Sequence, residues 1–135
     1  MFSVLIVEDV EATSQWLVSL ILQAFPEAQT TLCHDAATAR EKLLDRSYAL
    51  ALLDIHLPDD TGINLIAEVK AAHPNCCVVT MTVFDDSDTI FAAIQQGATG
   101  YLLKDQSEAI LVDKLQKAMH GDPLLSPSVA RKILG

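Results

Sequence analysis

The segment Ala49-Leu50-Ala51-Leu52-Leu53-Asp54 places a carboxylate directly after five consecutive apolar residues. A short apolar run of this kind is typical of a strand that is buried on both faces of a parallel sheet. Residues 4–7 (Val-Leu-Ile-Val) form a similar run, which ends on Glu8 and Asp9. The two segments therefore predict central strands with acidic groups at their carboxyl ends.

Short apolar or β-branched runs alternate with stretches of helical period along the whole chain. This alternation predicts an α/β fold of the flavodoxin-like kind, a doubly wound sheet of five parallel strands in the order 2-1-3-4-5. The predicted strands are residues 2–7, 29–33, 48–53, 76–81 and 99–103. Apolar side chains at helical spacing predict helices between them and at 108–120, and Trp16, Met81, Phe91 and Met119 are expected in the core.

The composition excludes several classes of protein. Eighteen acidic and nine basic residues give a net charge of −9, which repels nucleic acids and anionic lipid headgroups. No apolar run approaches the ~20 residues that span a bilayer, and the amino terminus lacks the pattern of a secretory signal. We expect a cytoplasmic protein in which Cys33, Cys76 and Cys77 are buried, reduced thiols.

The chain is predicted to contain one domain, residues 1–122. Residues 123–135 are predicted to form a linker and the start of a further helix, with Ser126 as N-cap and Pro127 in the first helical position. A helix of two turns is marginal by itself, so it either docks onto the domain or continues into sequence outside the chain.

Ligands of doubly wound sheets bind beyond the carboxyl ends of the strands. Glu8 and Asp9 follow the first predicted strand, Asp54 the third, Thr82 the fourth and Lys104 the fifth. Each residue alone has an ordinary explanation as a cap or a solvated side chain. Their placement together predicts one site at one edge of the sheet.

The residue types indicate the chemistry of this predicted site. Three carboxylates that converge repel one another unless a cation is bound, and oxygen ligands favour Mg²⁺, with Mn²⁺ as a substitute. The ammonium of Lys104 and the hydroxyl of Thr82 suit phosphate oxygens. Asp54 is then the predicted nucleophile, which would form an acyl phosphate.

From residue 4 to about residue 120 the chain resembles the receiver domain of bacterial response regulators. The resemblance lies in four segments: residues 4–9, residues 52–58 together with Gly62, Met81-Thr82, and residues 101–104. It implies transfer of a phosphoryl group to Asp54 from a phosphohistidine of a sensor histidine kinase. Slow self-catalysed hydrolysis would follow, without any other enzyme activity, and the resemblance adds the backbone carbonyl of His56 to the metal ligands.

The resemblance also implies a conformational switch. Thr82 would move toward the phosphoryl group and Tyr101 would turn inward, which changes the surface of the fourth helix, fifth strand and fifth helix, a surface suited to a homodimer. Residues 81–86, residues 100–105 and Leu125-Ser126-Pro127 are similar to the subfamily with a C-terminal helix-turn-helix (LuxR-type) output domain. DNA binding and transcription regulation would then depend on an output domain that is absent from this chain.

Three residues near the predicted site bear on the rates of phosphoryl transfer and hydrolysis. Val83 is bulkier than the small residue common at its position in the family, so we expect it to narrow access to Asp54 and to change the rates of phosphoryl transfer and hydrolysis. His56 and Phe84 match positions that tune the lifetime of the phosphorylated state in relatives, although a lone histidine is more often a solvated side chain.

Several alternatives stay open at this point. The chain is either a receiver fragment, which we favour, or a stand-alone receiver that acts through protein contacts. A Mg²⁺-dependent aspartyl phosphohydrolase is the second class, although such enzymes commonly place an acid where this chain has His56. A flavodoxin-like electron carrier is disfavoured because Glu8 and Asp9 would repel a cofactor phosphate, and intact site residues weigh against a degenerate dimerisation scaffold.

Overall fold

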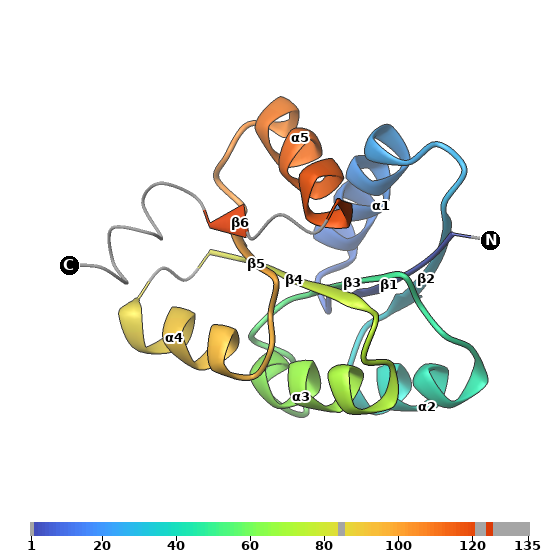
Figure 1. Cartoon of the computed structure of the whole chain (residues 1–135), viewed down its shortest axis with the longest axis vertical. Coiled ribbons are helices and arrows are strands. Elements are labelled where there is room, and N and C mark those ends of the chain that lie inside the picture. The colour runs from blue at the N-terminus through green and yellow to red at the C-terminus, as the bar shows by residue number, and fades with distance from the viewer. Residues whose placement is uncertain (1, 84–85, 121–123, 126–135) are drawn as a thin grey trace.

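The computed structural model of the chain describes residues 2–83, 86–120 and 124–125, and it has helices on both faces of a central parallel sheet (Figure 1). The strands are β1 (Ser3–Val7), β2 (Gln29–Cys33), β3 (Leu50–Leu53), β4 (Cys77–Thr82), β5 (Gly100–Leu103) and β6 (Leu124–Leu125). The helices are α1 (Glu11–Ala24), α2 (Ala36–Asp45), α3 (Gly62–Ala72), α4 (Ser87–Gln95) and α5 (Glu108–Met119).

The predicted order of the five strands is confirmed, and one short strand is added to it. The sheet runs β2-β1-β3-β4-β5-β6 with every pair parallel. In β6, Leu124 pairs with Gly100 and Leu125 with Tyr101, within a segment for which we predicted a linker. A strand of two residues is too short to carry a periodic pattern, so it could not be predicted from the sequence.

Three sequence predictions fall wholly or partly on residues that the structure leaves undescribed. The helix predicted after Ser126 lies outside the described residues, and so does Phe84. The boundary between residues 122 and 123 stays a prediction.

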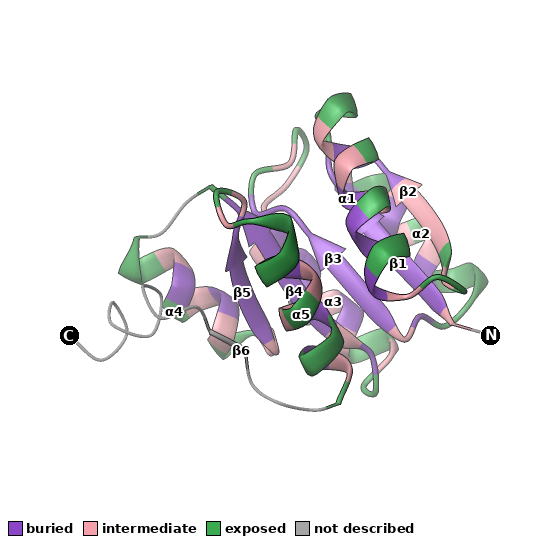
Figure 2. Ribbon diagram, turned by 90° about the horizontal axis from the view of Figure 1, so that it is seen from above, coloured by how far each residue is buried: buried purple, intermediate pink, exposed green. Residues whose placement is uncertain are grey.

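Alternation along the central strands builds two apolar layers. Leu5, Val7, Ala51 and Leu53 face α2, α3 and α4, whereas the side chains between them face α1 and α5. Figure 2 shows the strands as largely buried and the outward faces of the helices as exposed. Both faces of β1 and β3 are therefore dry, which explains their unbroken apolar sequences.

Of the five helices in the described ranges, four begin at a residue whose side chain accepts a hydrogen bond from a backbone amide of the first turn. These N-caps are Asp35 for α2, Thr61 for α3, Asp86 for α4 and Ser107 for α5. The exception is α1, whose N-cap Val10 has no such side chain. Its backbone amide instead donates to Oε2 of Glu8 at 3.2 Å.

The core prediction was right for Met81 and wrong for Phe91, which is 53% exposed. Ile90 and Ala93 form the buried face of α4, and the neighbour of a buried residue is turned by about 100° on a helix. Trp16 and Met119 are half-buried against the layer under α1 and α5.

The three cysteines are free, as expected, but only two of them are buried. Cys33 and Cys76 are buried and Cys77 is half-buried. Burial raises the pKa of the Cys33 thiol to about 11 and that of Cys76 to about 12. These thiols are therefore protonated at neutral pH and poorly reactive.

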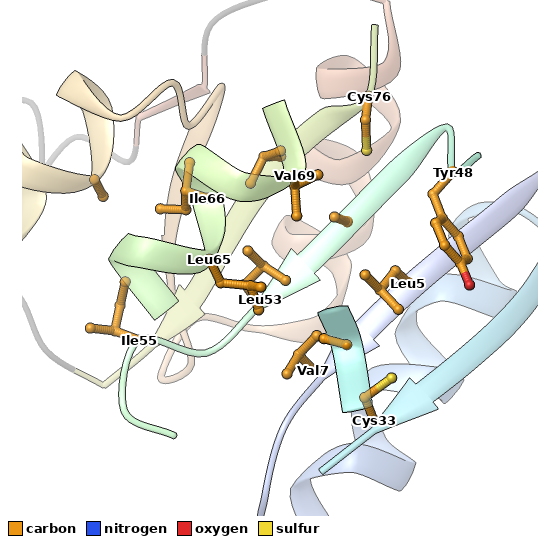
Figure 3. Packing of buried hydrophobic residues seen from close by; sticks show 14 of the residues in the cluster. Leu5, Val7, Cys33, Tyr48, Leu53, Ile55, Leu65, Ile66, Val69 and Cys76 are labelled. Carbon is orange, nitrogen blue, oxygen red and sulfur yellow. The ribbon is translucent and has the colours of Figure 1, made fainter. Parts of the chain in front are cut away.

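Tyr48 carries a polar atom into the apolar layer on the α2 and α3 side (Figure 3). The residue is 4% exposed, and its buried hydroxyl has no hydrogen-bond partner among the described residues. A buried hydroxyl without a partner destabilises the folded state because it loses its bonds to water.

We therefore expect Tyr48→Phe to raise the free energy of unfolding by about 1 kcal/mol. Urea denaturation followed by circular dichroism measures the difference. A loss of stability in this variant would show that the hydroxyl makes a favourable bond in solution.

Candidate functional site

The carboxyl ends of the central strands meet at one edge of the sheet. Val7 pairs with Leu53, so that Glu8 and Asp54 directly follow a pair of neighbouring residues. The backbone amide of Asp54 donates to the carbonyl of Val7 at 3.0 Å, which locks this register. Parallel pairing thus brings together acids that are 46 positions apart in the sequence.

The two strands on the other side of β3 bring Thr82 and Lys104 to the same edge. Thr82 pairs with Leu103, and the backbone amide of Lys104 donates to the carbonyl of Thr82 at 2.8 Å. Thr82 is the last residue of β4, whereas we predicted that it follows the strand. Its side chain is fully buried.

Three of the predicted metal ligands lie close together. One carboxylate oxygen from each of Glu8, Asp9 and Asp54 lies within 4.8 Å of the other two. Glu8 is 0% and Asp54 7% exposed, while Asp9 is exposed. A set of three carboxylate oxygens with one open side fits a hard divalent cation that keeps some water ligands.

Lys104 supplies the positive charge of this site. Its Nζ lies 2.5 Å from Oε1 of Glu8 and 3.2 Å from Oδ2 of Asp54, and 15% of the side chain is exposed. The ammonium therefore contacts both buried acids, and part of the side chain is exposed to solvent. From there it can also reach an anionic group bound to Asp54.

The buried position of Glu8 changes its titration. Burial is the largest cause of a pKa above the ordinary value, and the charge of Asp54 raises it further. The hydrogen bonds from Lys104 and from the amide of Val10 act in the opposite direction. The raised pKa means that the ionised carboxylate of Glu8 is held at a cost in the absence of a cation.

Tyr101 lies two register positions before the Thr82–Leu103 pair at the site edge. It pairs with Thr80 in β4 and is fully buried in the layer under α2, α3 and α4. Thr80 is buried as well, and its hydroxyl contacts the carbonyl of Gly100 at 3.4 Å. The aromatic ring of Tyr101 is thus turned inward in this structure.

The loop after Asp54 is folded tightly against it. His56 forms an antiparallel bridge with Thr61, and the amide of Gly62 donates to the carbonyl of Ile55 at 2.6 Å. A Cβ atom at position 62 would lie 2.0 Å from the carbonyl oxygen of Asp54, so only glycine fits. The imidazole of His56 is exposed.

Residues that we did not predict also contact the site segments. Nδ1 of His34 lies 3.0 Å from the carbonyl oxygen of Glu8, and Asp59, Asp60 and Arg40 connect the loop after Asp54 to α2. The consecutive acids Asp59 and Asp60 follow Asp54 by five and six residues and could have been noted from the sequence. The partners of these acids on α2 could be identified only from the fold.

Within the described part of the chain, no helix is both long and apolar enough to cross a bilayer.

The sequence of the chain was compared with known protein families and with known proteins. The model of the response regulator receiver domain matches residues 4–116. The chain is 35% identical over 83 residues to YxjL of Bacillus subtilis (strain 168), an uncharacterized transcriptional regulatory protein, a match that covers 62% of this chain and 38% of YxjL. It is 27% identical over 134 residues to the transcriptional regulatory protein LnrK of the same strain, a match that covers 99% of this chain and 61% of LnrK.

Solved structures share the fold. A LuxR-family two-component response regulator from Aurantimonas sp. SI85-9A1 superposes with a TM-score of 0.89 at 22% identity, covering 98% of this chain and 94% of that chain. The isolated REC domain of RcsB from Salmonella enterica serovar Typhimurium, with the phosphomimetic BeF3-, gives a TM-score of 0.86 at 19% identity and covers 98% of both chains. Since the family model matches most of the sequence, the chain belongs to the response regulator receiver domain family.

Proposed function

We propose that the chain is a phosphorylation-dependent switch that accepts a phosphoryl group on Asp54 from a sensor histidine kinase. The observation that carries this proposal is the buried Asp54, which lies within 4.8 Å of two other acids and within 3.2 Å of the ammonium of Lys104. The metal ligands would be Glu8, Asp9, Asp54 and the backbone carbonyl of His56. Mg²⁺ bound there would offset the negative charge of the phosphoryl oxygens.

The transfer assigns a task to each side chain. A carboxylate oxygen of Asp54 attacks phosphorus, and the bond to the imidazole nitrogen of the donor breaks. Lys104 neutralises charge on the phosphoryl oxygens, and the hydroxyl of Thr82 donates a hydrogen bond to one of them. Attack by water later releases phosphate and restores Asp54, so the chain catalyses only its own phosphorylation and dephosphorylation.

A phosphoryl group on Asp54 would also compete for Lys104, which contacts Glu8 and Asp54 in the described state. We propose that Thr82 moves in response to this change, that phosphorylation favours the inward position of Tyr101 already present in this structure, and that the surface around α4, β5 and α5 changes with them. If Thr82 and Tyr101 each have two positions, phosphorylation would shift the population from one conformation of the domain to the other.

The output of the switch is proposed from the relatives. YxjL and LnrK are transcriptional regulatory proteins, and this chain spans 38% and 61% of their lengths. We propose that residues 1–122 form the receiver part of a regulator of transcription, with residues 123–135 as its linker and an output domain that binds DNA. A stand-alone receiver and a Mg²⁺-dependent phosphohydrolase are the alternatives, and we propose a cytoplasmic location for all three.

The first test uses beryllofluoride, which mimics a phosphoryl group on a carboxylate. The wild-type chain is expected to bind it saturably, with a requirement for Mg²⁺, and Asp54→Asn is expected to abolish binding because an amide is not a nucleophile. Asp113→Asn, on the exposed face of α5, removes the same charge and serves as the control. Normal binding by Asp54→Asn would remove Asp54 from its proposed role, and rapid turnover of small phosphorylated compounds would favour the phosphohydrolase.

The second test measures how the buried carboxylate of Glu8 affects the stability of the folded chain. Without Mg²⁺ at pH 7, Glu8→Gln is expected to stabilise the chain, because the pKa of Glu8 is raised by burial and its charged form therefore opposes folding. The gain is present above the pKa of Glu8 in the folded state. It disappears as the pH falls through that pKa toward the ordinary value of 4.5, where both states bind the proton.

Thermal unfolding with and without Mg²⁺ measures both parts of this expectation. The ion should raise the melting temperature of the wild type more than that of Glu8→Gln, which lacks one ligand. Glu41→Gln makes the same chemical change at an exposed position of α2 and controls for the substitution itself. Lower stability of Glu8→Gln without Mg²⁺ would mean that the pair with Lys104 outweighs the burial of the carboxylate.

A homodimer through the surface of α4, β5 and α5 is the proposed consequence of phosphorylation. Phe91 on α4 and Val83 before it are 53% and 67% exposed, which gives this side of the molecule apolar contact area. Burial of an aromatic side chain at the centre of an interface often dominates its energy.

With beryllofluoride and Mg²⁺ present, Phe91→Ala is expected to weaken dimerisation by about tenfold in Kd. Sedimentation equilibrium measures the change. Leu44→Ala removes an 88% exposed apolar side chain from α2 and should leave the Kd unchanged. Equal effects of the two variants would argue against this surface.

A further inference from the structure

The loop between β3 and α3 is attached to α2 by two consecutive carboxylates. Asp59 accepts hydrogen bonds from the backbone amides of Ala36 at 2.9 Å and Ala37 at 3.0 Å. These are the first two residues of α2, whose amides have no partner within the helix. The charge of Asp59 also suits the positive end of the helix, so α2 and the loop stabilise each other.

Asp60 makes the second attachment, through Arg40. One oxygen of Asp60 accepts from the amide of Thr61 at 2.7 Å and from the side chain of Asn64 at 3.0 Å. The other oxygen pairs with Nη2 of Arg40. The ion pair with Arg40 helps to hold the pKa of Asp60 below its ordinary value.

Arg40 extends this attachment to α3. Its Nε lies 2.5 Å from Oε2 of Glu68 and its Nη2 lies 2.9 Å from Oε1, a two-pronged contact that fixes the plane of the guanidinium. Arg40 on α2 therefore holds the loop through Asp60 and the body of α3 through Glu68 at the same time. Only 37% of its side chain is exposed.

Residues 55–58 connect Asp54 to these two acids. Asp54, at the start of this segment, is held by the hydrogen bond from its amide to the carbonyl of Val7 and by the close approach of Gly62 to its own carbonyl oxygen. His56 lies between Asp54 and the two acids, and it bridges to Thr61, the residue after Asp60. Displacement of Asp60 would therefore move the backbone at His56, while Asp54 would stay in register.

We propose that Arg40, Asp59 and Asp60 are positioning residues for the metal site, and that α2 sets the place of the backbone at His56. The inference rests on the proposed function, since it concerns the Mg²⁺ site described above. Residues that hold a ligand from outside commonly change metal affinity when they are replaced. Here the contact is indirect, so we expect about a tenfold effect, the lower end of that range.

Arg40→Gln is the decisive variant because charge and position predict different results. Loss of a positive charge by itself does not weaken the binding of a divalent cation and strengthens it if the charge is close. Loss of the contacts to Asp60 and Glu68 should instead loosen the loop, so the positioning role predicts a Kd for Mg²⁺ raised about tenfold. Titration calorimetry of the whole chain with MgCl2 at constant ionic strength measures the Kd.

Two further variants and a control complete the experiment. Arg40→Lys keeps the charge without the two-pronged contact and should fall between wild type and Arg40→Gln. Asp59→Asn, which leaves Arg40 intact, should also raise the Kd and provides a second route to the same loop. Lys117→Gln removes a positive charge and an exposed ion pair with Asp113 on α5, and it should leave the Kd within about twofold of wild type.

Hydrogen exchange supplies a readout that does not involve the metal. The amides of Thr61 and Gly62 should exchange faster in Arg40→Gln than in wild type or Lys117→Gln. Unchanged or tighter Mg²⁺ binding by Arg40→Gln would overturn the inference, and so would a lower melting temperature with an unchanged Kd. A wild-type chain that binds no Mg²⁺ would instead remove the proposed metal site, and this inference with it.

Discussion

The arrangement at the carboxyl edge of the sheet depends on one constraint: Glu8 and Asp54 are buried side by side and share the ammonium of Lys104. Two carboxylates out of water repel each other, and burial adds a further cost for each charge. The contacts of 2.5 Å and 3.2 Å from Lys104 offset part of this cost. The raised pKa of Glu8 shows that one lysine does not offset all of it.

The buried apolar core and the helix N-caps contribute favourable free energy of folding, which offsets this electrostatic cost. Both faces of β1 and β3 are covered by helices, and their apolar side chains are fully buried. Four helices have side-chain N-caps. Among the described residues, the buried carboxylates lie at this one edge of the sheet, beside the exposed Asp9.

Elements away from the acidic cluster also contact the segments that carry it. α2 is far from Lys104 in the sequence, and it lies between β2 and β3 in the chain. Arg40 and the amino end of α2 nevertheless contact the loop that follows Asp54. On the other side, Tyr101 is held between its neighbour Thr80 and the added strand β6. The loop after Asp54 and the proposed switch residue Tyr101 are thus each in contact with a neighbouring element of the fold.

The sequence by itself determined the fold class, the order of five strands and the residues that meet at one edge. It could do so because strands buried on both faces must be apolar throughout, and because parallel strands bring their carboxyl ends together. Only the tertiary structure decided that Phe91 is exposed, that Leu124–Leu125 pair with β5 and that Arg40 reaches Asp60 and Glu68. These features depend on how helices turn and which surfaces they meet, and no local periodicity records such long-range contacts.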